Sequence, residues 1–126
     1  MIVGIGTDLV NISRIEASMA RNPQALARRV LTPVELDHFL AAAKPAAYLA
    51  KRFAAKEAAS KALGTGIGRI SWQDLEVSND HQGAPQLSCT GNAALRLAEL
   101  GASRVHLSLA DEQDAALAFV VISREP

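Results

Sequence analysis

The segment from Arg52 to Gly66 constrains the fold of this chain more than any other segment. At about 100° per residue, a helix over this segment separates its side chains into two faces. One face is almost entirely alanine and comprises Ala54, Ala55, Ala58, Ala59, Ala62 and Leu63. Because alanine side chains are short, we expect another element to pack against this face at close range. Gly64 is typical of the residue just past a helix C-terminus, so the helix is predicted to end there.

The opposite face of this helix carries polar groups, namely Lys56, Glu57, Ser60 and Lys61. A carboxylate between two ammonium groups, with a hydroxyl beside them, suits a phosphate that is bridged by a metal ion. The same residues also suit an ordinary solvated face, in which Glu57 and Lys61 form an ion pair four residues apart. The helix alone leaves both interpretations open.

A second informative segment lies at the N-terminus, where a strand is predicted over residues 2–10. Gly4, Gly6 and Asp8 share one face of this strand. Glycines inside a strand usually mark the close approach of a ligand or of another backbone. Asp8, next along the same face, could hold a hard cation through oxygen, or it could cap the following turn or helix. The Gly-x-Gly pattern is a weak nucleotide signal, because it lacks a third glycine and lies inside the strand.

Length, charge and cysteine content limit the class of protein. A chain of 126 residues accommodates a single domain over 1–126. The formal net charge of +0 argues against nucleic acid as a partner, and no apolar run approaches membrane-spanning length. The single cysteine, Cys89, excludes an intrachain disulfide and favours a reducing compartment, and no histidine near it supports a nucleophilic role. No signal peptide is apparent, so we expect a cytoplasmic protein.

Helices are predicted mainly in the first half of the chain and strands mainly in the second. The expected helices run from an N-cap at Asn11 to about Asn22, from Pro23 onward, from Thr32 to about Ala43, from Pro45 to Gly64, and over 91–100 after an N-cap at Thr90. The other expected strands cover 75–77, 85–88, 104–110 and 115–123. Thr32 and Glu35 form a capping-box pattern around Pro33. The last two strands are predicted to form an antiparallel hairpin, and the order of elements favours an α+β fold.

Two smaller groups of polar residues have alternative interpretations. Arg14 and Arg21 lie seven residues apart on the first predicted helix and therefore share a face, which could dock an acidic partner or be an ordinary solvated surface. On the strand over 104–110, Arg104, His106 and Ser108 share a face that could contact phosphate or be the wet side of a sheet. No histidine and cysteine spacing predicts zinc, and no nucleophile elbow predicts a hydrolase triad.

Taken together, several motifs resemble those of the holo-[acyl-carrier-protein] synthase family, the small bacterial-type 4′-phosphopantetheinyl transferases. The first motifs are Gly4-Ile5-Gly6-Thr7-Asp8 with Arg14-Ile15-Glu16, and Arg52-Phe53-Ala54-Ala55-Lys56-Glu57-Ala58 with Lys61-Ala62-Leu63-Gly64-Thr65-Gly66. The later motifs are Gly83-Ala84-Pro85 and His106-Leu107-Ser108-Leu109-Ala110-Asp111 through Ala116–Ile122. The likeness covers essentially the whole length of the chain.

The resemblance implies a fold and an activity. The fold would be an antiparallel sheet with helices packed on one side, including one long alanine-rich helix. The family moves the 4′-phosphopantetheine arm of coenzyme A onto a serine of apo acyl carrier protein, in a Mg²⁺-dependent reaction that releases adenosine 3′,5′-bisphosphate. Its members form homotrimers with active sites at the subunit interfaces. Whether the carrier protein serves fatty acid biosynthesis or polyketide synthesis does not follow from the sequence.

The resemblance also implies roles for individual residues. Asp8 and Glu57 would hold Mg²⁺, and Lys56 and Lys61 would neutralise charge on the pyrophosphate, with Asp8, Glu57 and Lys61 as the catalytic residues. The coenzyme site would be lined by Arg52, Ser60 and Gly64, and from a neighbouring subunit by Pro85, His106 and Ser108. The acidic carrier protein would dock on Arg14 and Arg21.

One segment departs from the family pattern, because many members have a histidine where this chain has Ala110-Asp111. The proton of the acceptor serine could pass to a water or hydroxide on the metal, or to a carboxylate such as Asp111. Two other functions stay open, namely an adaptor that binds an acidic protein without catalysis and a phosphohydrolase that cleaves coenzyme A. The pair of Asp8 and Glu57 argues against the adaptor, since a docking surface needs no cation site.

Overall fold

The structure is a computed structural model that describes residues 1–125. Its main sheet has the strand order β1-β5-β4, with both pairings antiparallel, and β2 and β3 form a separate antiparallel ribbon. The strands are β1 (Ile2–Asn11), β2 (Leu75–Asn79), β3 (Pro85–Cys89), β4 (Arg104–Asp111) and β5 (Ala115–Ser123). The helices are α1 (Ile12–Arg21), α2 (Ala25–Val30), α3 (Pro33–Ala41), α4 (Pro45–Ala62) and α5 (Gly91–Glu99), with a short 3₁₀ helix η1 (Trp72–Asp74). The predicted α+β class is confirmed.

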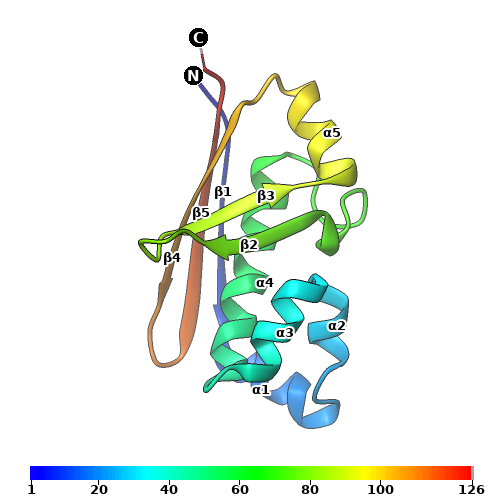
Figure 1. The fold of residues 1–126 in the computed structure, drawn as a ribbon, viewed down its shortest axis with the longest axis vertical. Helices are drawn as coiled ribbons and strands as arrows, with labels where there is room; N and C mark the ends of the chain where they lie inside the picture. Colours follow the sequence, from blue (N-terminus) through cyan, green and yellow to red (C-terminus); the bar gives the residue numbers. More distant parts are fainter. Residues whose placement is uncertain (126) are drawn as a thin grey trace.

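The helices all lie on one side of the main sheet, and the other side is bare (Figure 1). Helix α4 runs along the covered face, where it packs against β1 and β5. Small and aliphatic side chains of β5 point toward it and are fully or almost fully buried, namely Ala116, Ala118, Val120 and Ile122. The bare face instead exposes large apolar side chains, with exposed fractions of 59% for Ile5, 65% for Leu9, 43% for Leu117 and 39% for Phe119.

The contact between β1 and α4 depends on glycine. A Cβ atom at Gly6 would overlap the carbonyl oxygen of Ala58 and lie 2.8 Å from the amide nitrogen of Ala62. A Cβ atom at Gly4 would overlap the carbonyl oxygen of Ala62 in the same way. The predicted close approach is therefore confirmed, and the approaching group is the backbone of the alanine-rich helix.

The helix ends follow the sequence signals only in part. The capping box of α3 is confirmed, because the Glu35 amide donates to Thr32 Oγ1 (3.4 Å) and the Thr32 amide donates to Glu35 Oε1 (2.9 Å). Gly64 follows the end of α4 with a φ of 74°, as predicted for a residue past a helix C-terminus.

Asn11 and Thr90 occupy the predicted N-cap positions of α1 and α5, but neither side chain accepts the capping hydrogen bond expected of it. Asn11 is the last residue of β1, and the first amide of α1, that of Ile12, donates instead to the Asp114 carbonyl in the β4–β5 turn (2.9 Å). Likewise α2 begins at Ala25, two residues later than predicted. A tertiary contact thus replaces the local cap at the start of α1. None of the helices over residues 1–125 combines the length and apolar character that crossing a membrane requires.

Candidate functional site

Asp8, Glu57 and Lys61 form a group at the β1 edge of the sheet, which we call the carboxylate cluster. Asp8 lies on the face of β1 that meets α4, and its side chain is 17% exposed. Lys61 Nζ lies 3.1 Å from Asp8 Oδ1 and donates to the Thr7 carbonyl at 3.0 Å. In the structure, therefore, Lys61 pairs with Asp8 on strand β1. The solvated-face interpretation instead paired Lys61 with Glu57 on the same helix.

The two carboxylates influence each other electrostatically. Burial raises the pKa of Glu57, and the negative charge of Asp8 raises it further, while Lys61 and Arg14 act in the opposite direction. A cation between the carboxylates would relieve this repulsion. Within residues 1–125 no three His, Cys, Asp or Glu side chains gather at one point, so the chain supplies two carboxylates at most. That donor set fits Mg²⁺, which keeps waters and takes one or two carboxylates together with substrate phosphates.

A basic groove adjoins the carboxylate cluster along α1, with a volume of about 360 Å³. It is lined by Arg14, Ile15, Ser18, Arg21, Leu26, Arg29, Phe53, Glu57 and Trp72. Arg14 and Arg21 share this surface as their spacing predicts, and the Arg14 guanidinium stacks 5.6 Å from the Phe53 ring centre. The arginines and Glu57 thus border one hollow, which we call the α1 groove.

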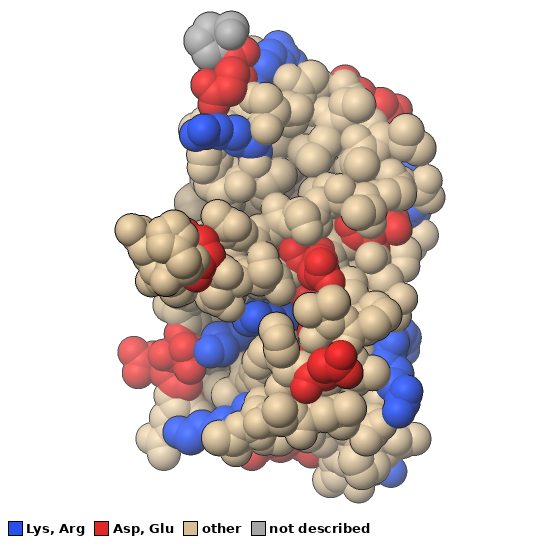
Figure 2. All heavy atoms as spheres, in the orientation of Figure 1, with Lys and Arg blue, Asp and Glu red and all other residues tan. Residues whose placement is uncertain are grey.

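A second hollow of about 330 Å³ lies at the opposite, β4 edge of the sheet, and we call it the Arg52 hollow. Its lining consists of Tyr48, Lys51, Arg52, Asn79, Gly83, Pro85, Leu109 and Asp111. Basic side chains are visible in it between the turns of the β2–β3 ribbon and of the β4–β5 hairpin (Figure 2).

Arg52 is only 6% exposed, and its Nε has no hydrogen-bond partner within the described part of the chain. The guanidinium stacks 4.4 Å from the Tyr48 ring centre, and Nη2 reaches Asn79 Oδ1 only at 3.5 Å. Lys51 adds a second positive charge to the hollow. A buried and incompletely satisfied guanidinium favours an anionic group of a ligand at this point.

The main sheet separates the carboxylate cluster, with the α1 groove beside it, from the Arg52 hollow. Asp8 on β1 pairs with Ala118 on β5, which in turn pairs with Leu109 on β4. One whole strand therefore lies between the carboxylate cluster and the wall of the Arg52 hollow. Pro85 and Arg52 line the same hollow of one chain, whereas the resemblance places them in different subunits. Within one chain, neither residue joins the carboxylate cluster.

Lys56 and Ser60 are placed differently from the sequence interpretation. Both side chains are completely buried. Lys56 Nζ lies 2.6 Å from Glu35 Oε1, and Ser60 Oγ donates to the Glu57 carbonyl at 2.8 Å. The interpretation that they share an accessible polar face with Glu57 is therefore wrong, and Lys56 is not free to contact a bound pyrophosphate. The physical reason is that α4 is enclosed by other elements, so its polar face does not coincide with a solvent face.

His106 and Ser108 lie on the bare face of the sheet, as the alternation along β4 predicts. His106 Nε2 is 3.0 Å from Ser123 Oγ on the neighbouring strand. Neither residue faces the carboxylate cluster of its own chain, since Asp8 lies on the covered face. Burial raises the pKa of Cys89 to about 11, which supports the expectation that its thiol is no nucleophile.

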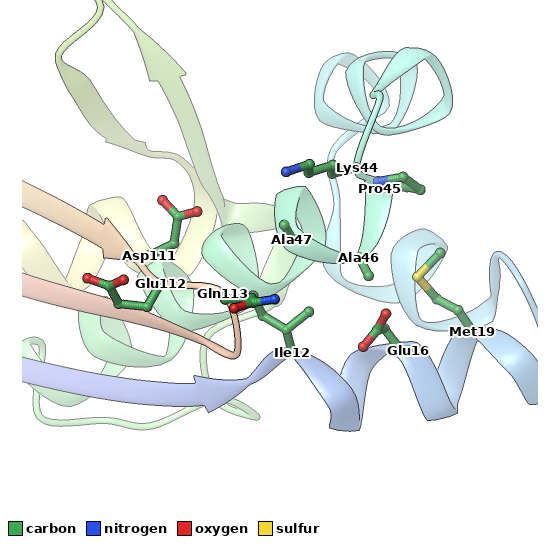
Figure 3. Close-up of a pocket in the computed structure, with 10 residues that line it drawn as sticks. All are labelled: Ile12, Glu16, Met19, Lys44, Pro45, Ala46, Ala47, Asp111, Glu112 and Gln113. Carbon is green, nitrogen blue, oxygen red and sulfur yellow. The ribbon is translucent and has the colours of Figure 1, made fainter.

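A further hollow, of about 500 Å³, lies between α1, the start of α4 and the β4–β5 turn (Figure 3). Its lining includes Lys44 and the carboxylates of Glu16, Asp111 and Glu112. Asp111 is the only candidate from the sequence that borders it, and Asp111 Oδ1 lies 3.8 Å from Lys51 Nζ. Sequence reasoning did not identify Lys51 or Tyr48. For Tyr48 the available signal was its spacing of four residues from Arg52 on the same helix.

Comparison with known proteins gives a consistent result. Residues 4–120 match the 4′-phosphopantetheinyl transferase superfamily. A holo-[acyl-carrier-protein] synthase of Shewanella loihica is 55% identical over 97% of this chain and 98% of its own length. The crystal structure of holo-[acyl-carrier-protein] synthase from Neisseria meningitidis superposes with a TM-score of 0.92 at 49% identity, covering 98% of this chain and 100% of that one. A Bacillus anthracis holo-(acyl-carrier-protein) synthase in complex with CoA (3′,5′-ADP) gives a TM-score of 0.81 at 38% identity, covering 99% of both chains.

Proposed function

This chain belongs to the holo-[acyl-carrier-protein] synthase family of phosphopantetheinyl transferases, and we propose that it moves the 4′-phosphopantetheine arm of coenzyme A onto a serine of an apo acyl carrier protein. The second product is adenosine 3′,5′-bisphosphate. One observation carries the proposal beyond likeness, namely that Asp8 and Glu57, distant in sequence, lie close enough for the charge of Asp8 to raise the pKa of Glu57. Glu57 of this pair lines a groove that is rich in arginine, where an acidic protein can dock.

The carboxylate cluster would hold Mg²⁺ through Asp8 and Glu57. Bound there, the ion would neutralise charge on the pyrophosphate of coenzyme A as the serine oxygen forms its bond to the phosphate that carries pantetheine and the phosphoanhydride bond to adenosine 3′,5′-bisphosphate breaks. Lys61, whose side chain is 53% exposed, lies 3.1 Å from Asp8 and can turn toward a phosphate oxygen. Ser60 and Gly64 contribute indirectly, by shaping the C-terminal part of α4. Ser60 binds the Glu57 carbonyl, and Gly64 lets the chain turn away after α4.

A complete site would draw on two copies of the chain, because the carboxylate cluster and the Arg52 hollow lie at opposite edges of the sheet. When one edge of a copy meets the other edge of the next, the interface is head-to-tail, and such contacts form a ring when the rotation between copies closes on itself. We propose a homotrimer of this kind. The bare apolar face of the sheet supports it, since exposed Leu9, Leu117 and Phe119 would be covered there. In this arrangement Arg52, Pro85, His106 and Ser108 serve the carboxylate cluster of the neighbouring copy.

Mass spectrometry of apo acyl carrier protein, incubated with coenzyme A and Mg²⁺, tests the function. The carrier should gain the mass of one phosphopantetheine, and a chelator of divalent cations should prevent the gain. An unchanged carrier with intact coenzyme A would favour the adaptor. Breakdown of coenzyme A without transfer would favour the phosphohydrolase.

The double variant Arg14→Ala with Arg21→Ala tests the docking surface. We expect the KM for the carrier protein to rise about tenfold or more, because two of the charges that attract the acidic partner are removed. The KM for coenzyme A should stay close to that of the parent. Arg69→Ala is a matched control, since the Arg69 side chain is 63% exposed but lines a hollow beside α5, away from the α1 groove. A larger change in the KM for coenzyme A than for the carrier would contradict the docking role.

The variant Phe119→Glu tests the assembly. Its carboxylate would stand in the middle of the bare apolar face, where burial without a partner is costly. Light scattering coupled to size exclusion should give three chains for the parent and one for the variant, and transfer activity should fall with the assembly. Leu95→Glu is the control, because Leu95 is 65% exposed on α5, away from the sheet. A parent that is active as a monomer would overturn the shared site.

A further inference from the structure

A buried ion pair between Glu35 on α3 and Lys56 on α4 has no role in the function derived above. The two charged side chains are exposed by 1% and 0%, and Lys56 Nζ lies 2.6 Å from Glu35 Oε1. Burial lowers the pKa of Lys56, while the charge of Glu35 opposes that effect. Desolvation largely offsets the attraction within such pairs, so stability alone explains them poorly. Their position relative to the site is therefore informative.

The pair binds the backbone of three further segments. Glu35 Oε1 accepts from the Thr32 amide at 2.9 Å, and Glu35 Oε2 accepts from the Val77 amide at 2.7 Å. Lys56 Nζ also donates to the Val30 carbonyl at 2.6 Å. The network thus joins the end of α2, the start of α3, the middle of α4 and strand β2. Because each of these bonds is directional, the network fixes how the four elements are oriented.

The four joined elements carry residues of the carboxylate cluster, of the α1 groove and of the Arg52 hollow. Lys56 immediately precedes Glu57, and α2 carries Arg29 of the α1 groove. Strand β2 ends at Asn79, which lines the Arg52 hollow together with Pro85 on β3. An error in the orientation of α4 relative to these elements would therefore move Glu57 with respect to Asp8. It would also move the walls of the two hollows.

The other short hydrogen bonds that α4 makes to neighbouring elements lie near its two ends. The Tyr48 hydroxyl donates to the Glu35 carbonyl at 3.2 Å, and Lys61 Nζ donates to the Thr7 carbonyl at 3.0 Å. Its buried face toward the sheet is mostly alanine, and most of the opposing positions on β1 and β5 are small as well, namely Gly4, Gly6, Ala116 and Ala118 beside the larger Val120 and Ile122. Such surfaces pack closely but interdigitate little, so they oppose a small rotation weakly. Lys56 reaches across to α2 and α3 and provides the directional constraint that the alanine face lacks.

We propose that Glu35 and Lys56 are positioning residues, which set the orientation of α4 so that Glu57 meets Asp8 at the geometry a divalent cation requires. The inference rests on the proposed metal role of Asp8 and Glu57. Residues that orient metal ligands in this way change metal affinity by roughly 10–100-fold when they are replaced. Neither side chain touches the substrate.

The double variant Glu35→Gln with Lys56→Met tests the inference, because it removes both charges and keeps similar side-chain volumes. Neutral replacement of a whole buried pair commonly preserves folding, so we expect the double variant to fold. Its Tm should be lower than that of the parent, because a glutamine has a single oxygen to accept from the Thr32 and Val77 amides. Mn²⁺ serves as the probe, and its binding to the full chain is followed by water-proton relaxation. We expect Mn²⁺ affinity and kcat to fall at least about tenfold.

The variant Leu49→Ala is the matched control. Leu49 is fully buried on the same helix, so its loss lowers stability through a cavity without touching the network. Measured well below its Tm, it should bind Mn²⁺ like the parent. The inference is wrong if the double variant binds Mn²⁺ normally, or if Leu49→Ala loses affinity equally. Should the double variant fail to fold, Glu35→Asp, which keeps the charge but shortens the reach, must show the same loss of affinity.

The same titration separates this inference from the proposed function. If the parent binds no Mn²⁺, or if Glu57→Gln binds it as tightly as the parent, the metal role itself is wrong. If the parent binds Mn²⁺, Glu57→Gln does not, and the double variant matches the parent, only the positioning role fails.

Discussion

Replacing Glu57 with glutamine is expected to leave the chain folded and to remove metal-dependent transfer. The amide keeps the volume of the carboxylate but loses its negative charge, so Asp8 alone would face the cation. We expect kcat to fall by about 10²–10³ or more, the range found when one group that stabilises transition-state charge is removed. Mass spectrometry of the carrier protein over time, at saturating coenzyme A and Mg²⁺, measures the loss. The control is Glu99→Gln, since Glu99 lies exposed on α5.

The stability of the Glu57 variant provides a second readout. Because the pKa of Glu57 is raised in the folded chain, the folded state holds its proton more tightly than the unfolded state. Stability of the metal-free parent should therefore be greater below the ordinary pKa of a glutamate. It should decrease as the pH rises through the raised value. Glu57→Gln should lack this decrease in urea titrations across the same pH range. Normal transfer by this variant would refute the metal role of Glu57.

Replacing Gly6 with alanine is expected to produce the largest loss of stability among single small substitutions in this chain. The new methyl group would overlap the carbonyl oxygen of Ala58, and both partners are backbone, so neither can rotate away. We expect a loss of about 3 kcal/mol, as for severe overpacking, and a Tm lower by roughly 10 °C for a domain of this size. Urea and thermal unfolding followed by circular dichroism measure both quantities.

Gly66→Ala provides the comparison for this prediction. Gly66 has a φ of 70° and open space where a Cβ atom would lie, so alanine there experiences backbone strain without a clash. Its expected cost is roughly 1–2 kcal/mol. If Gly6→Ala were no more destabilising than Gly66→Ala, α4 and β1 would be separated by more than the structure indicates.

The sequence predicted the elements of this fold well where the signals were local. The capping box of Thr32 and Glu35 and the glycine after α4 are examples, because their hydrogen bonds and dihedral angles depend on a few neighbouring residues. The glycines of β1 predicted a close approach for the same reason. Asn11 shows the limit of such signals, since a carbonyl more than 100 residues away, in the β4–β5 turn, satisfies the start of α1 instead.

The candidate site was less predictable than the fold. Helical spacing grouped Lys56 with Glu57, but spacing cannot tell which sector of an enclosed helix meets solvent and which meets α3. Glu35 was recognised through its cap, yet its contact with Lys56 lies 21 residues away in sequence. The separation of Arg52 from Asp8 follows from the strand order β1-β5-β4, which no local pattern encodes.

The placement of the two hollows at opposite edges of one sheet has a consequence for how the activity responds to protein concentration. If every reaction centre needs an edge from each of two copies, a separated chain carries two incomplete halves and no working centre. Dilution below the concentration at which the copies dissociate would then abolish the transfer activity while each chain remains folded. In a ring, a single inactive copy would likewise disable the reaction centre that it shares with its neighbour.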